Sequence, residues 1–205
     1  RRRRPAPTAG PRLPVLLGAG LLSGLVVVVE YPLALAGAIL GVYGMLHPQA
    51  LGRGLVPLAS RGAVYAAGVI AGVLPALAYN QWAFGSIGTM SYDNAVDRQG
   101  FTGHDTLGLN SGGFFGITMP DARVALELLI SPRGLFALTP VVLMGVVGVV
   151  LLHRRGMKAE ARTIAAIALA FFIYDTGYWL PFGGGSPGPR FLIPVLPFLG
   201  VALVE

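Results

Sequence analysis

Six apolar runs separated by charged or helix-breaking residues constrain this chain more than any other feature. They cover residues 13–29, 32–46, 63–79, 136–152, 163–181 and 191–204. A transmembrane helix needs about 20 predominantly apolar residues, and most of the runs approach that length. Hydrophobic residues make up 54% of the chain and charged residues only 12%, whereas soluble domains carry about 25% charged residues. We therefore predict an all-α fold, a polytopic transmembrane helix bundle of about six segments with one long outer loop.

The first two runs are separated by the sequence Glu30-Tyr31-Pro32. A helix tends to end before the residue that precedes a proline. As one helix, residues 13–46 would also be about 50 Å long, which far exceeds the thickness of a bilayer core. We therefore expect a tight helical hairpin with its turn at this sequence.

The distribution of basic residues predicts how the bundle is oriented. Eleven of the 15 lie within residues 1–12, 47–62 and 153–162, and the positive-inside rule places such segments in the cytoplasm. Residues 1–12 then form a basic cytoplasmic lead, and residues 80–135 form an extracytoplasmic loop. We treat residues 1–205 as a single membrane domain. We also expect them to be a fragment of a larger polytopic protein, since the last run is short for a span.

The outer loop contains aromatic side chains, which disordered segments lack, so we expect it to be ordered. They are Trp82, Phe84, Tyr92, Phe101, Phe114 and Phe115. Near the end of the loop, the sequence Asp121–Ile130 after Pro120 predicts a short amphipathic helix. Its apolar residues Val124, Leu128 and Ile130 would lie on the bilayer surface.

Composition excludes several classes of site. The chain has no cysteine, so it holds neither a disulfide nor a cysteine-ligated metal. Its three histidines, His47, His104 and His153, are too far apart to form a known metal-binding motif. The net charge of +6 comes from residues that flank apolar runs, which argues against nucleic acid as a partner. We predict membrane lipid as a partner and no cofactor, and we leave a divalent metal open.

The sequence between the last two runs indicates a binding site. Residues 183–190 read Gly-Gly-Gly-Ser-Pro-Gly-Pro-Arg and lead directly into an apolar run. A glycine-rich turn that exposes backbone N–H groups can hold an anion, and an arginine beside a membrane segment is rarely idle. Arg133 is a second outer arginine at a helix entrance, and the two guanidinium groups would form a clamp for a phosphate. The alternative is a tight turn with two arginines that extend independently to water or lipid phosphate.

Three other residues form a possible polar site. Asp175 lies inside an apolar run, where an acidic residue indicates function unless it sits at the interface and is held by hydrogen bonds. Glu30 would accept a hydrogen bond from a sugar hydroxyl or form an ion pair with Arg190. The alternative is a solvated turn residue. Tyr178 lies near Asp175 and is equally well explained as an anchor in the aromatic belt at the membrane surface.

Four stretches together carry a family resemblance: 79–86, 131–136, Thr139-Pro140 and 183–198. They resemble the later membrane region of bacterial GT-C-type glycosyltransferases, the protein-mannosyltransferase-like and aminoarabinose-transferase-like group. The resemblance implies an integral protein of the bacterial plasma membrane that transfers a sugar from a polyprenyl-phosphate donor to an acceptor on the outer face.

The resemblance also implies roles for individual residues. Arg190 and Arg133 would bind the donor phosphate, and Gly184 and Gly185 would let the lipid head group approach the backbone. The family's catalytic acid lies in an early outer loop that has no counterpart here, so the catalytic residues are unknown. There are two alternatives. One is a fragment of a transporter or flippase, with Asp175 and Arg190 as its charges within the membrane. The other is a non-catalytic membrane scaffold.

Overall fold

The computed structural model describes residues 13–47, 55–89, 117–183 and 186–203, and the structural statements below concern these residues. This part of the chain is all-helical apart from an isolated bridge between Ile117 and Tyr178, which confirms the all-α part of the predicted fold class. It divides into two compact units, Arg1–Tyr79 and Asn80–Glu205, and each unit is described by itself.

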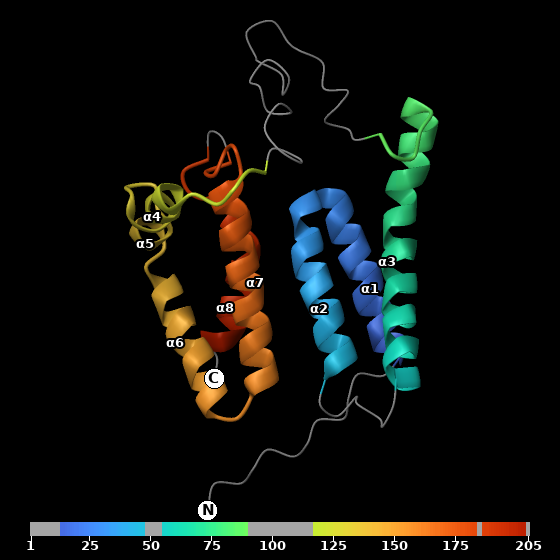
Figure 1. The fold of residues 1–205 in the computed structure, drawn as a ribbon, viewed down its shortest axis with the longest axis horizontal. Coiled ribbons are helices and arrows are strands. Elements are labelled where there is room, and N and C mark those ends of the chain that lie inside the picture. The colour runs from blue at the N-terminus through green and yellow to red at the C-terminus, as the bar shows by residue number, and fades with distance from the viewer. Residues whose placement is uncertain (1–12, 48–54, 90–116, 184–185, 204–205) are drawn as a thin grey trace, which may run out of the picture. The chain divides into compact units, whose positions relative to one another are not determined.

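The first unit contains the predicted hairpin and the long helix that follows it (Figure 1). Helix α1 covers Leu13–Val29, a 3₁₀ turn η1 covers Tyr31–Leu33, and α2 covers Ala34–Leu46. Glu30 is extended, with φ −153° and ψ 115°, and Pro32 lies in the first turn of η1. The helix therefore breaks at the predicted place. Helix α3 covers Leu55–Phe84, so it is much longer than the predicted run 63–79.

Helices α1 and α3 touch through their backbones at glycines. A Cβ on Gly20 would collide with the carbonyl oxygen of Tyr65, and one on Gly68 would collide with that of Leu17. Gly24 and Gly72 make the same kind of approach one turn further along. Each helix thus carries a Gly-x-x-x-Gly sequence on its contact face, the arrangement that lets membrane helices approach closely. This pattern is visible in the sequence, and our sequence analysis missed it.

Tyr65 joins α2 to the same contact. A Cβ on Gly41 would lie 2.7 Å from the Tyr65 ring, so the ring fills the space beside that glycine. The Tyr65 hydroxyl donates to the carbonyl oxygen of Gly37 at 2.6 Å and lies 2.7 Å from the hydroxyl oxygen of Ser23. A buried hydroxyl without partners is costly, so these two bonds fix how the three helices meet.

The second unit is built around an antiparallel pair of helices. Helix α6 covers Val141–Arg154 and α7 covers Lys158–Gly177, with Gly156 at φ 97° between them (Figure 1). The short helices α4, Ala122–Ile130, and α5, Leu135–Leu138, precede α6. A 3₁₀ helix η3, Arg190–Val195, and α8, Leu196–Leu203, close the unit. Helix α8 packs against α6, where Cβ atoms on Gly145 and Gly148 would collide with Leu199 and Ala202.

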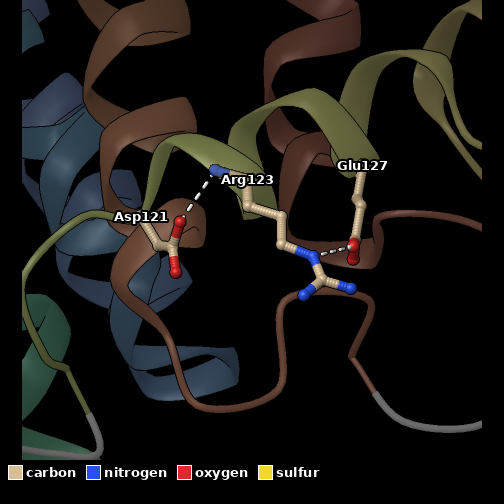
Figure 2. Close-up of polar contacts among 3 residues, drawn as sticks. All are labelled: Asp121, Arg123 and Glu127. Atoms are coloured by element: carbon tan, nitrogen blue, oxygen red, sulfur yellow. Dashed lines mark hydrogen bonds and ion pairs between the residues drawn. The ribbon is translucent and has the colours of Figure 1, made fainter.

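Two details differ from the sequence predictions. The run 136–152 does not form one helix, because Thr139 and Pro140 separate α5 from α6. The predicted amphipathic helix is present as α4, capped by the Asp121 carboxylate, which accepts from the Arg123 backbone N–H at 2.7 Å (Figure 2). Leu128, however, is fully buried in the unit and does not lie on a surface. The large apolar residues exposed on α4 are Leu126 and Ile130.

Among the described helices, one is long and apolar enough to cross a membrane. It is Val56–Phe84, and 17% of its apolar window is buried. The pair Ala122–Leu138 and Val141–Arg154, bent by 92°, would be a second if it formed one span. Leu13–Val29, Tyr31–Leu46 and Arg190–Leu203 are apolar but shorter. The six-segment transmembrane arrangement therefore remains a proposal.

The glycine contacts predict opposite effects for two neighbouring substitutions in α1. Gly20→Ala should lower the free energy of unfolding by about 1–3 kcal/mol, because the added methyl group meets backbone that must shift. A Cβ on Gly18 would meet no atom of a neighbouring element within 4 Å, so Gly18→Ala should raise the free energy by about 0.5–1 kcal/mol through helix propensity. Thermal unfolding of both variants in detergent checks this. Equal effects of the two substitutions would contradict the backbone contact.

Candidate functional site

Residues 182–190, which end at the first residue of η3, are here named the arginine loop. Among its described residues, the Ser186 hydroxyl contacts the carbonyl oxygens of Phe182 and Gly188, the latter at 2.6 Å. Gly183 adopts φ 72°, a left-handed conformation that glycine allows and that most other residues avoid. Gly184 and Gly185, the predicted phosphate-binding glycines, lie outside the described residues.

Arg133 holds the arginine loop from the neighbouring connection between α4 and α5. Its guanidinium group donates to the carbonyl oxygen of Ser186 and lies 4.9 Å from the centroid of the Phe182 ring. A Cβ on Gly188 would lie 2.5 Å from a methyl carbon of Leu138 and 3.4 Å from the carbonyl oxygen of Arg133. The two segments are therefore in close contact at Phe182, Ser186 and Gly188.

Arg190 closes the arginine loop and begins η3. Its side chain is exposed, and its guanidinium carbon lies 5.7 Å from the centroid of the Phe191 ring. A Cβ on Gly183 would come within 2.8 Å of the Arg190 Cβ, so the glycine makes room for the arginine stem. Arg133 thus contacts the arginine loop from outside it, and Arg190 is the last residue of the loop. Each guanidinium group is a planar cation with N–H donors and no acceptor.

Asp175 is the least expected feature of this region. It continues the buried stripe of α7, whose earlier members are Ala161, Ile164, Ile167 and Phe171. Its side chain is fully buried, and neither carboxylate oxygen has a hydrogen-bond partner among the described residues. Burial of a polar group without a compensating hydrogen bond is unfavourable, so Asp175 stands at a position where packing alone would favour an apolar residue.

The end of α7 is also a junction with the chain that leads into α4. Thr118 donates to the carbonyl oxygen of Gly177 through both its backbone N–H, at 2.7 Å, and its hydroxyl, at 3.1 Å. Asp121 donates its backbone N–H to the carbonyl oxygen of Thr176 at 3.2 Å. These bonds satisfy helix-end carbonyl groups that would otherwise lack partners.

An aromatic cluster lies beside this junction. The rings of Tyr174 and Tyr178 stack with centroids 5.3 Å apart, and Phe191 meets both edge-on, at 6.0 Å and 5.0 Å. Trp179 lies 5.7 Å from Tyr178. Tyr178 therefore joins the end of α7 to the residue that follows Arg190. Its predicted roles, in a polar site or an aromatic belt, stay predictions.

Glu30, the remaining predicted site residue, belongs to the first unit. Glu30 is a half-buried residue of the first unit between α1 and η1, and its pairing with Arg190 stays a prediction. Among the described residues, no three histidine, cysteine or acidic side chains are grouped so as to hold a metal ion. The loop aromatics Tyr92, Phe101, Phe114 and Phe115 lie outside the described residues.

No family model, curated protein or solved structure matches this chain. The interpretation of the site therefore depends on its geometry and on the resemblance carried by the sequence.

Sequence reasoning missed the residues that build the arginine loop. Ser186 was available as a signal, because a serine among glycines and prolines commonly bonds to nearby backbone. Phe182 and Leu138 carried no such signal, since their contacts with residues 133 and 188 join segments far apart in the chain.

The burial of Asp175 predicts an unusual response to substitution. Asp175→Leu should raise the free energy of unfolding by about 1–3 kcal/mol, the usual penalty of a buried polar group without a partner, and Asp175→Asn should not lower it. Ile167→Asn, which places an amide at a fully buried position of the same stripe, is the control and should be strongly destabilising. Thermal unfolding in detergent measures all three. A loss with Asp175→Leu as large as that of the control would show that the carboxyl group has a stabilising partner.

Proposed function

We propose that this chain is part of a polytopic membrane glycosyltransferase that moves a sugar from a polyprenyl-phosphate donor to an acceptor on the outer face of the bacterial plasma membrane. The observation that carries the proposal is the contact of Arg133 with the arginine loop, whose last residue is Arg190, in the stretches that resemble GT-C-type enzymes. Two guanidinium groups at one loop suit a phosphate, whose oxygens they match in geometry and charge.

A membrane location is supported by the exposed apolar surface of the helices. On α1, many large apolar side chains are exposed. They include Leu13, Val15, Leu17, Leu22, Leu25 and Val29. Helix α3 has most of its apolar window exposed, unlike the core helix of a soluble protein. Soluble monomers rarely expose apolar patches larger than a few hundred Å², so a bilayer is the natural solvent for these faces. The six-segment bundle is part of this proposal.

In the proposed reaction, the acceptor hydroxyl attacks the anomeric carbon of the sugar. The bond from that carbon to the phosphate oxygen breaks as the new glycosidic bond forms, and the acceptor loses its proton to a base. Polyprenyl phosphate leaves with an additional negative charge. Arg190, supported by Arg133, would stabilise that charge electrostatically. The base is not among the residues that we assign.

A transporter or flippase is the second candidate, and Asp175 is the observation that favours it. Acidic residues buried in membrane helices often mark paths for ions or protons. Coupled transport by the chain in vesicles, abolished by Asp175→Asn, would favour this candidate over the transferase.

The proposed phosphate site predicts the effect of substituting Arg190. Arg190→Ala should weaken binding of polyprenyl phosphate by about 1.5–3 kcal/mol, the scale of a hydrogen bond to a charged group. Arg190→Lys should restore part of the loss, because it keeps the charge without the planar pair of donors. Titration of the protein in nanodiscs with polyprenyl phosphate measures both.

Arg123→Ala is the matched control for this experiment. Arg123 is also an exposed arginine of the second unit, but it pairs with Glu127 on α4 at 3.0 Å (Figure 2). This control should bind like the parent protein. Unchanged binding by Arg190→Ala, with a normal unfolding curve, would contradict the phosphate site.

A further inference from the structure

The segment that contains α4 and α5 lies across the direction of α6. The segment Ala122–Leu138, which contains α4 and α5, makes an angle of 92° with Val141–Arg154. If α6 is inserted in a membrane, a segment perpendicular to it cannot also point through the bilayer. Its axis then runs along the membrane plane, at the end of the second unit where the arginine loop lies.

The surface of α4 is divided into three strips. Leu128 is fully buried, in a helix that packs against α7. Leu126 and Ile130, which are 58% and 68% exposed, are four residues apart and so share another face. Arg123 and Glu127 form an ion pair beside that face, with the Arg123 Nε 3.0 Å from Glu127 Oε1 (Figure 2). A strip of exposed leucine and isoleucine beside charged groups is the pattern of a helix at an apolar–water boundary.

The exposed apolar surface continues from α4 along the chain into α5 and α6. Its further members are Leu138, Val141, Leu143, Met144, Val146 and Val147, and Met119 precedes α4. This continuity indicates that lipid covers the whole surface. The lipid that surrounds an inserted α6 would also contact α4 where the chain turns. The Asp121 side chain caps the first turn of α4 and stabilises the helix before it meets lipid. Contact with lipid would therefore require little further ordering of the chain.

We infer that α4 is an interfacial helix that lies in the head-group plane of a lipid bilayer, with Leu126 and Ile130 immersed among the upper acyl chains and the Arg123–Glu127 pair among the head groups. This inference rests on the membrane location in the proposed function. An apolar helix face typically enters the boundary by about 5–10 Å. The arginine loop would then be held at the depth of lipid phosphate by the contact of Arg133 with Ser186.

The absence of cysteine from the chain allows this to be tested with single fluorescent labels. The variants Leu126→Cys, Ile130→Cys and Arg123→Cys are labelled with an environment-sensitive dye and reconstituted in phosphatidylcholine vesicles. Quenching is compared between lipids that carry a quencher on the acyl chains and iodide in the buffer. Labels at residues 126 and 130 should be quenched severalfold more by the lipid than the label at residue 123, and iodide should show the reverse order.

Two results would overturn the inference. Iodide quenching at residues 126 and 130 equal to that at 123 would mean that this face meets water. Protection of these two labels from both quenchers would mean that protein covers it. A label at Val147→Cys on α6 separates this failure from that of the proposed function. Lipid quenching at 147 without quenching at 126 and 130 would refute the interfacial helix alone, whereas no lipid quenching at any position would refute the membrane location as well.

Discussion

Direct contact between helix backbones at glycines is the constraint on which the first unit depends. Gly20 and Gly24 of α1 meet Gly68 and Gly72 of α3 so closely that a methyl group at these positions has no room. Between membrane helices, where lipid is as apolar as leucine, such close approach and a few hydrogen bonds replace the hydrophobic effect as the source of association. The Tyr65 hydroxyl supplies those bonds to α1 and α2. The large aliphatic side chains are left to point outward, which accounts for the apolar surface of the unit.

The second unit uses the same kind of contact between α6 and α8, but it adds a polar end. There the arginine loop, the Arg133 connection and the junction of Thr118 with Gly177 come together through backbone carbonyl groups. A loop fixed in this way can present charged side chains without reorganising when a ligand binds, which favours electrostatic binding. Asp175 is the exception to the apolar packing beneath this end, and packing does not explain its burial without a hydrogen-bond partner among the described residues.

Much of the fold could be predicted from the sequence because apolar runs and helix breakers are local signals. The start and end of α1 and the break at Glu30 to Pro32 agree with the structure. The extent of α3 was wrong because its ends are less apolar than its centre, and helix continuity does not depend on hydropathy. The division at Thr139 and Pro140 was hidden by the uninterrupted apolar pattern around it. In the site, the two arginines were identifiable by type and position, but the contacts of Arg133 with Ser186 and Phe182 depend on tertiary packing and leave no local pattern.

The central claim is that this is a membrane protein with its arginine loop on the outer face. Labelling of single cysteines with a membrane-impermeant thiol reagent tests it most directly, since the parent chain has no cysteine to react. Ala122, at the start of α4, is exposed and lies in the unit that carries the loop, whereas Ala159 lies in the first turn of α7, within the basic 153–162 segment. The account predicts that Ala122→Cys is labelled on intact cells and that Ala159→Cys is labelled only after the membrane is permeabilised. Labelling of Ala159→Cys on intact cells would contradict it.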